Sequence, residues 1–222
     1  MCGRFTLRTP AHALAEAFGV PERPNLAPRY NIAPTQAVAA VRRAECGREL
    51  VMLRWGLIPA WAKDAAIGNR MINARAETVA DKPAFRAAFR HRRCLIAADG
   101  FYEWRKTGGG AKQPYHIRLE SGAPFAIAGL WERWRPPDGE AVESCTLITT
   151  GANALLAPIH ERMPVILGPE DYDAWLDPEP PSAGALTALL RPYPADRMSA
   201  FAVSRVVNDP RNDTEACIAP AA

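Results

Sequence analysis

The residue with the clearest chemical potential is Cys2, which becomes the first residue of the mature chain once Met1 is removed. We expect this removal because the side chain of cysteine is small. The mature residue then carries an α-amine and a thiol on adjacent carbons, and reactive forms of both groups exist at neutral pH. The amine can condense with an aldehyde to a Schiff base, and the thiol can then close a thiazolidine ring. If Met1 is retained, its peptide bond blocks the amine.

The other cysteines and the histidines form no disulfide or metal-binding pattern. The five cysteines are far apart and include no C-x-x-C pair, which is typical of a reducing compartment. The four histidines lack H-E-x-x-H and zinc-finger spacing, so we expect no metal site. No glycine-rich nucleotide-binding motif is present, and we expect no cofactor.

The composition is that of an ordinary folded protein with an excess of proline. Of 222 residues, 48% are hydrophobic and 23% are charged, which argues against disorder. The 21 prolines predict many loops and short helices. The sequence contains no apolar run long enough to span a membrane and no signal-peptide layout at its start. We therefore expect a cytoplasmic protein, associated with the nucleoid if it is bacterial.

Positive charge is concentrated in one part of the chain, although the formal net charge is only +3. Residues 70–106 contain nine Lys or Arg against four Asp or Glu, whereas residues 168–190 contain five acids and no Lys or Arg. Such asymmetry directs the basic segment toward a polyanion. A solvated helix face around residues 86–93 is an equally good explanation of the charge.

The local patterns predict one α+β domain over residues 1–222, with a mostly antiparallel, barrel-like core and short peripheral helices. Apolar runs between turn residues predict strands at residues 37–41, 50–55, 94–98, 115–119, 125–131, 145–149, 164–167 and 201–207. Helices are predicted at residues 10–19, 81–90, 152–158, 171–176 and 183–190. Proline and glycine predict irregular structure at residues 20–35 and 56–72.

Six blocks in this sequence resemble those of the SOS response-associated peptidase family, abasic-site processing proteins that crosslink to abasic sites in single-stranded DNA. The blocks are MCGRF (1–5), RYNIAPT (29–35), RWGLIP (54–59) with Trp61, INARAET (72–78), ADGFYEW (98–104), and LITT (147–150) through IHERMP (159–164). They occur in family order within residues 1–165, and residues 166–222 are expected to complete the same domain. Six ordered blocks make the resemblance specific.

The resemblance implies a covalent reaction at an abasic site. It assigns the nucleophile to Cys2, an orienting hydrogen bond to Asn73, and an acid/base pair to Glu103 and His160. The chemistry asks for such groups, because opening the closed abasic sugar needs an acid and forming the imine needs a base. Burial among aromatic residues would raise the pKa of Glu103. Taken alone, Glu103 is better explained as a rim carboxylate and His160 as a helix-end cap, and only together with the six blocks do they favour the acid/base pair.

The resemblance also implies a surface that holds DNA phosphates without reading base sequence. The residues assigned to this surface are Arg4, Pro34, Trp55, Trp61, Arg75, Thr149, Thr150 and Arg162. Trp55 and Trp61 are either core residues or a stacking wall for bases. The expected partner is single-stranded DNA with abasic sites, with the replication machinery as a further candidate, and a monomer is expected.

Two other functions fit part of the same pattern. One is a cysteine peptidase with Cys2 as nucleophile and His160 as base. The family name reflects this idea, but we take the self-cleavage of the family to be the removal of Met1, which an aminopeptidase could also perform. The other is a non-covalent single-stranded DNA-binding module in which Cys2 is incidental. The Schiff base would in addition permit β-elimination, a lyase side reaction.

Overall fold

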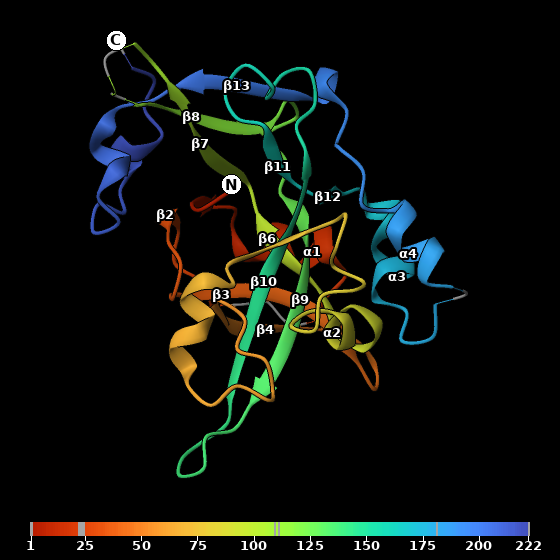
Figure 1. Cartoon of the computed structure of the whole chain (residues 1–222). Helices are drawn as coiled ribbons and strands as arrows, with labels where there is room; N and C mark the ends of the chain where they lie inside the picture. The colour runs from red at the N-terminus through yellow and green to blue at the C-terminus, as the bar shows by residue number, and fades with distance from the viewer. Residues whose placement is uncertain (1, 22–24, 109, 111, 181, 222) are drawn as a thin grey trace.

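Two β-sheets form most of the computed structural model, which describes residues 2–21, 25–108, 110, 112–180 and 182–221 (Figure 1). The larger sheet contains β3 (Ala37–Ala44), β4 (Gly47–Trp55), β5 (Asn73–Arg75), β6 (Arg93–Ala98), β9 (Phe125–Trp134), β10 (Val142–Gly151), β11 (Arg162–Pro164) and β12 (Ile166–Leu167). The smaller sheet contains β1 (Phe5–Leu7), β2 (Arg29–Ile32), β7 (Gly100–Lys106), β8 (Lys112–Leu119) and β13 (Met198–Ala202).

Strand β10 closes the larger sheet into a barrel. It pairs antiparallel with β9 and parallel with β4, so the ring β10-β4-β3-β6-β9 returns to its start. The other pairings in this ring are antiparallel, and β6 is buried along its whole length. The α+β class with a mostly antiparallel, barrel-like core is therefore confirmed.

The smaller sheet, in the order β13-β8-β7-β1-β2, positions the beginning of the chain. Phe5 pairs with Phe101, and the Tyr102 N–H donates to the Arg4 carbonyl (3.0 Å). Because β1 and β7 are antiparallel, the residues before Phe5 lie beside Glu103. Figure 1 shows the N-terminus near the middle of the molecule, between the smaller sheet and the barrel.

The helices are short and peripheral. Helix α1 (Ala11–Phe18) ends at Gly19, whose φ of 62° is left-handed and suits glycine at a helix end. Figure 1 shows α2 (Arg86–His91), α3 (Tyr172–Leu176) and α4 (Ala183–Ala188) together on one side of the barrel. Short 3₁₀ helices cover Ala65–Arg70, Pro169–Asp171, Ala195–Arg197, Arg205–Asn208 and Glu215–Cys217. Within the described residues, no helix has the length and apolarity of a membrane span.

The helix predicted at residues 152–158 is wrong, because this segment forms turns. The Asn153 side chain accepts a hydrogen bond from the Leu156 N–H (3.0 Å) and so caps a single turn. Pro158, which has no N–H to donate, does not extend that turn into a helix. The segment instead carries the chain to β11 and places His160 just before it.

The strand predicted at residues 201–207 is only partly correct, and four short strands have no clear signal in the sequence. β13 ends at Ala202, and Ser204 then caps the 3₁₀ helix Arg205–Asn208. β1, β2 and β5 are fixed by partners far away along the chain, whereas β7 pairs both with the distant β1 and with its neighbour β8. Asp213, for example, accepts hydrogen bonds from the N–H groups of Tyr30 (2.5 Å) and Asn31 (2.9 Å) on β2.

Candidate active site

Cys2 is buried where the smaller sheet meets the barrel. Asn73, at the start of β5, donates from Nδ2 to the Cys2 carbonyl (2.8 Å). The Cys2 thiol is 0% exposed and lies 3.8 Å from the Arg4 carbonyl. Burial, and then the charge of Glu103, raise the pKa of this thiol well above its ordinary value. The sulfur is therefore a protonated thiol at neutral pH.

The carbonyl oxygen of the Asn73 side chain has unused capacity to accept a hydrogen bond. This Oδ1 atom is buried and accepts no hydrogen bond from the residues that the structure describes. The amide orientation follows from the bond that Nδ2 donates to Cys2. An unsatisfied buried acceptor costs about 1–3 kcal/mol. Asn73 thus fixes the backbone of Cys2 and presents a free acceptor beside it.

Glu103 and His160 face each other next to Cys2. Glu103 lies on β7 with its side chain 2% exposed, whereas the side chain of His160 is 26% exposed. His160 Nε2 lies 4.0 Å from Glu103 Oε2. The Arg162 N–H donates to His160 Nδ1 (3.0 Å), so the neutral imidazole carries its proton on Nε2, toward Glu103.

Burial disfavours the charged forms of both Glu103 and His160. It raises the pKa of Glu103 to about 7 and lowers the pKa of His160 below 6.5. Near neutral pH the pair is thus a partly protonated carboxyl group and a neutral imidazole, not an ion pair. Groups with pKa values near the working pH are suited to general acid–base catalysis.

Arg75, Thr149 and Thr150 lie beside Asn73 at one end of the barrel. β5 runs parallel to β10, with Asn73 opposite Leu147 and Arg75 opposite Thr149. Arg75 is exposed, whereas Thr149 and Thr150 are buried, and the Thr149 hydroxyl lies 3.3 Å from a backbone carbonyl of β5. The Arg75 guanidinium is therefore exposed to solvent, whereas the Thr149 hydroxyl is hydrogen-bonded within the protein.

Arg162 lies at the same end of the barrel and is already paired. Its guanidinium donates to both carboxylate oxygens of Glu77 (2.6 and 2.9 Å) and to the Thr149 carbonyl (2.6 Å). This two-bond geometry is the one in which arginine also binds a phosphate. The Glu77 carboxylate therefore occupies the edge of Arg162 that a DNA phosphate would use.

Arg4 joins the start of the chain to its C-terminal part. Its Nη1 donates to Asn31 Oδ1 (2.9 Å) and to the Val207 carbonyl (2.8 Å). Burial lowers the pKa of Arg4, although a guanidinium stays charged at neutral pH. Arg4 also lines an open pocket together with Gly3, so it both braces the fold and faces solvent close to Cys2.

The two tryptophans assigned to DNA binding have opposite environments. Trp55 is 0% exposed and its indole N–H donates to the Ile72 carbonyl (2.9 Å), so it is the core residue of the two alternatives. Trp61 is 61% exposed. Its loop is held by Trp134, whose indole N–H donates to the Ala62 carbonyl (2.7 Å). Only Trp61 can stack on a base without rearrangement of the protein.

Pro34 lies in a tight turn that is fixed on the barrel. The next residue, Thr35, has a φ of 73°, which a β-branched residue rarely adopts. The Thr35 N–H donates to the Trp55 carbonyl (2.8 Å). Unfavourable backbone angles of this kind persist only where the surroundings fix them, and they are frequent at functional sites. The turn thus holds the half-buried Pro34 in one orientation.

Lys112 belongs to this region but to none of the sequence blocks. It is the first residue of β8 and pairs with Lys106 on β7. Its charge lowers the pKa of Glu103, against the larger effect of burial, and also contributes to the lowered pKa of His160. The available sequence signal is the run of glycines before Lys112, which is typical of a hairpin turn.

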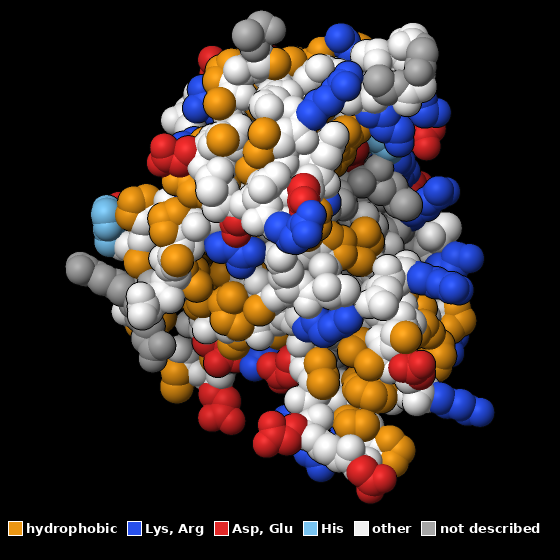
Figure 2. Space-filling model, turned by 90° about the vertical axis from the view of Figure 1, so that its left-hand side faces the viewer, with side chains coloured by type: hydrophobic (Ala, Val, Ile, Leu, Met, Phe, Trp, Pro, Cys, Tyr) orange, Lys and Arg blue, Asp and Glu red, His pale blue; other side chains and the backbone are white. Residues whose placement is uncertain are grey.

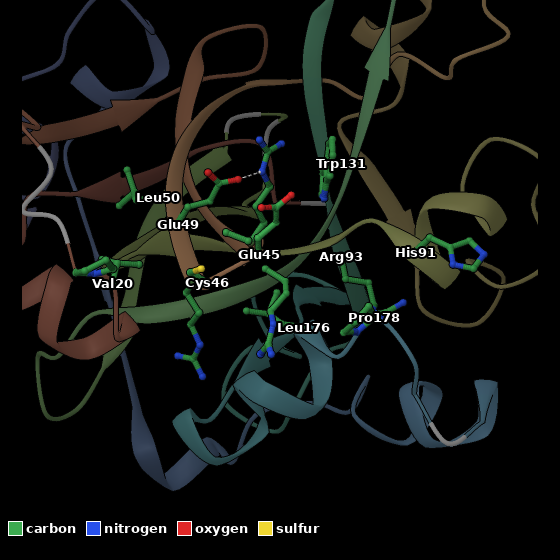
Figure 3. Close-up of a pocket in the computed structure, with 15 residues that line it drawn as sticks. Val20, Glu45, Cys46, Glu49, Leu50, His91, Arg93, Trp131, Leu176 and Pro178 are labelled. Carbon is green, nitrogen blue, oxygen red and sulfur yellow. Dashed lines mark hydrogen bonds and ion pairs between the residues drawn. The ribbon is translucent and has the colours of Figure 1, made fainter.

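A pocket of about 940 Å³ lies elsewhere, and none of Cys2, Glu103 or His160 lines it (Figure 3). Figure 3 shows Val20 and His91 at its two ends and a dashed line from Glu49 to Arg42. Arg42 also pairs with Glu143 and lies 4.3 Å over the Trp131 ring. The charge of Arg42 is therefore neutralised within the protein. The volume of this pocket alone does not make it the candidate active site.

Both signs of charge are found on the surface. Figure 2 shows Lys and Arg side chains over much of one face, with several Asp and Glu side chains toward its lower edge. Within the basic segment 70–106, however, Arg92 pairs with Glu132, and Arg93 is buried and donates to backbone carbonyls. These two arginines stabilise the fold, so the charge excess of the segment overstates what is available to a polyanion.

Comparison with known proteins finds matches that cover most of the chain. A model of the family described as SOS response associated peptidase (SRAP) matches residues 1–210. Abasic site processing protein YoqW of Bacillus subtilis (strain 168) is 45% identical over 217 residues, 96% of this chain and 97% of that protein. Abasic site processing protein HMCES of Rattus norvegicus is 31% identical, covering 100% of this chain and 76% of that protein. An X-ray structure of a protein from Bacteroides thetaiotaomicron matches with a TM-score of 0.88, at 28% identity and with full coverage of both chains. This chain therefore belongs to the SOS response-associated peptidase family.

Proposed function

We propose that this protein binds abasic sites in single-stranded DNA and forms a covalent thiazolidine crosslink through Cys2, shielding the lesion. The observation that carries the proposal is the meeting of Cys2, Asn73, Glu103 and His160 at one place. Relatives named abasic site processing proteins support the same substrate. The proposal requires removal of Met1, by self-cleavage or by an aminopeptidase, and Met1 lies outside the described residues.

The reaction joins two atoms of Cys2 to one carbon of the sugar. The free α-amine attacks C1′ of the ring-opened aldehyde, and loss of one water leaves an imine. The Cys2 sulfur then adds to the same carbon while its proton passes to the nitrogen, which closes the ring without further loss of atoms. Because both nucleophiles belong to one residue, the second step has a large effective concentration.

Glu103 and His160 supply the proton transfers. A carboxyl group with a pKa of about 7 holds a proton at neutral pH and can give it to the ring oxygen of the closed sugar. The neutral imidazole of His160 can accept protons as the amine and thiol react. The unsatisfied Oδ1 of Asn73 can accept from the amine of Cys2 or from a sugar hydroxyl.

The binding surface suits a lesion that occurs at any base. Arg75 and Arg162 lie beside the reactive residues and can hold phosphates, a contact that carries no sequence information. The exposed indole of Trp61 offers a stacking surface for a neighbouring base, and bases are available for stacking in single strands.

The structure gives less support to a peptidase that acts on other proteins. Peptidases with a cysteine nucleophile lower the pKa of the thiol through a partner imidazole, whereas burial raises the pKa of the Cys2 thiol. His160 faces Glu103, and the hydrogen-bond acceptor nearest the thiol is the Arg4 carbonyl. We therefore restrict the peptidase reaction to the removal of Met1.

The test uses mature protein and a single-stranded oligonucleotide with one abasic site, with products separated on a denaturing gel. The wild type should give a denaturant-resistant adduct, and Cys46→Ser, at an exposed cysteine outside the site, should match it. Cys2→Ser and Cys2→Ala keep the amine but lose the stable ring, and β-elimination of their imine should cleave the strand. Binding without any wild-type adduct would instead identify a non-covalent binding module.

A further inference from the structure

A positively charged pocket lies on the smaller-sheet side of Cys2. Arg75 and Arg162, the cations described above, lie on the barrel side. It is open, has a volume of about 570 Å³, and is lined by Gly3, Arg4, Trp104, Lys112, Arg205 and Asn208. We propose that this pocket, the Lys112 pocket, binds a backbone phosphate next to the abasic nucleotide, so that the strand is held on both sides of Cys2. The inference rests on the proposed function and adds a second anchor to it.

The walls of the Lys112 pocket are fixed by hydrogen bonds between distant segments. The Trp104 indole N–H donates to Asn208 Oδ1 (2.8 Å), which docks the 3₁₀ helix Arg205–Asn208 against β7. Arg4 donates to the Val207 carbonyl (2.8 Å) and holds the same helix against the start of β1. The pocket is thus built by three parts of the chain and does not depend on one surface loop.

The charge of the Lys112 pocket suits an anion. Lys112 and Arg205 are exposed and form no ion pair with any residue in the described part of the chain. The acidic residue next to the pocket along the chain, Asp209, is paired with Arg211 (2.6 Å). A phosphate that binds between Lys112 and Arg205 releases counterions, which favours binding at low salt.

The Lys112 pocket is adjacent to the reacting groups. Gly3 follows Cys2 directly, and Trp104 follows Glu103. Lys112 lines the pocket beside these residues, at the end of the β7–β8 pairing that begins on the Glu103 strand. A nucleotide within a strand has one phosphate on each side, so a lesion centred on Cys2 presents one phosphate to the barrel side and one to this pocket. The half-buried Trp104 adds an apolar wall for the adjoining sugar or base.

The test measures non-covalent affinity for an oligonucleotide that carries a tetrahydrofuran abasic analogue, which has no aldehyde and cannot react with Cys2. Two further oligonucleotides replace one phosphate by an uncharged methylphosphonate, either on the 5′ or on the 3′ side of the analogue. Each is measured with the wild type, with Lys112→Ala/Arg205→Ala, and with Arg86→Ala, an exposed cation on α2 outside the pocket. Inorganic phosphate is added as a competitor. It tests whether the pocket binds the free phosphate ion as well as a phosphodiester of the strand.

For the wild type, we expect neutralisation of either flank to weaken binding by roughly fivefold. In Lys112→Ala/Arg205→Ala, one of the two flanks should lose its effect, and the slope of log affinity against log salt should fall by about 0.7, one phosphate. Arg86→Ala should behave as the wild type. The proposal would be overturned if neutralising either phosphate still weakened the binding of Lys112→Ala/Arg205→Ala. It would also be overturned if inorganic phosphate competed equally well with the wild type and with this double variant. Failure of the crosslinking proposal is a separate result, seen as no adduct with the aldehyde.

Discussion

Two pairs of a carboxyl group and an imidazole lie along β7, one at its start and one in its middle. Asp99 is linked to His116 through the Thr6 hydroxyl, and Glu103 faces His160. Both carboxyl groups are buried, at 4% and 2% exposed, so burial alone does not separate them. They differ in their partners, and in the proposed function this difference separates a structural carboxyl group from a reactive one.

The Asp99 region is an anchor. Its carboxylate accepts hydrogen bonds from the Thr6 hydroxyl (2.6 Å) and from the backbone N–H groups of Arg8 (2.6 Å) and Thr9 (2.8 Å). These bonds tie the end of β1 to the start of β7. Gly100 leaves room for the anchor, because a Cβ at this position would lie 2.2 Å from an imidazole nitrogen of His116. The Asp99 carboxylate is thus held by hydrogen bonds within the fold.

In the proposed function, the Glu103 region is the reactive site. Burial raises the pKa of Glu103 to about 7, and the imidazole that faces it is partly exposed. A carboxyl group in this state can give or take a proton near neutral pH. The comparison therefore predicts that the same acid-to-amide change costs reaction rate at Glu103 and stability at Asp99.

The largest effect is expected for Glu103→Gln, which keeps the shape of the side chain and removes its titratable proton. The rate of adduct formation should fall by about 10²–10⁴-fold, the range that general acid–base catalysis supplies. Single-turnover rates on denaturing gels, measured across pH values around neutrality, should also lose the titration near pH 7. The control is Glu132→Gln, a buried carboxyl group paired with Arg92 outside the site. An unchanged pH profile in Glu103→Gln would break the comparison.

Asp99→Asn tests the other side. The amide cannot accept all the hydrogen bonds that the carboxylate receives, so the free energy of unfolding should fall by about 1–3 kcal/mol. Denaturant unfolding measures this loss. The adduct rate of the folded variant should change far less than that of Glu103→Gln. A large rate loss without a stability loss would assign Asp99 to the reactive site instead.

The pH dependence of stability should separate the two regions by sign. Burial lowers the pKa of His116 from 6.5 to about 4, so its contribution is present above pH 6.5 and is lost as pH falls toward 4. Burial raises the pKa of Glu103 from 4.5 to about 7, so its contribution is present below pH 4.5 and is lost as pH rises toward 7. Each amounts to roughly 3 kcal/mol, and they oppose each other between these limits.

Glu103→Gln should therefore be more stable than the wild type at pH 7 and should lose stability more steeply on acidification. His116→Gln should show the reverse, with a weaker loss of stability toward low pH. Denaturant unfolding at several pH values measures both slopes, and His91→Gln, at an exposed histidine, provides the control. Parallel stability curves for all the variants would show that neither buried group controls the pH dependence.

The smallest effect concerns a third, exposed carboxylate. Glu77 occupies the guanidinium of Arg162, and Glu77→Gln should free it for a phosphate. Affinity for single-stranded DNA should rise by up to about fivefold at low salt, since exposed ion pairs are worth little. Fluorescence anisotropy at two salt concentrations measures the change. Weaker binding would mean that Glu77 positions Arg162 for DNA rather than competing with DNA.

Local patterns predict much of the fold, and they fail where distant partners decide. The runs at residues 37–41, 94–98 and 125–131 contain enough alternating or continuous apolar residues to identify β3, β6 and β9. β5 is three residues long and depends on a parallel pairing with β10. No local pattern carries that information, because the partner strand lies more than seventy positions away.

The site was predictable to the extent that its residues lie in sequence blocks. The structure brings Asn73, Glu103 and His160 around Cys2, although no spacing along the chain predicts this meeting. The sequence block that contains Trp55 fits a core residue and a stacking wall equally well. Only the burial of Trp55 in the structure decides between these two roles. Lys112 has no block, and only the hairpin of β7 and β8 brings it to the site.

The intact mass of the mature protein after incubation with a single-stranded abasic oligonucleotide tests the central claim most directly. The account predicts that the free protein lacks the mass of Met1. It also predicts a denaturant-stable product equal to protein plus oligonucleotide minus one water, absent from Cys2→Ser. A wild-type protein that has lost Met1 and binds the oligonucleotide, yet forms no such product, would contradict the account.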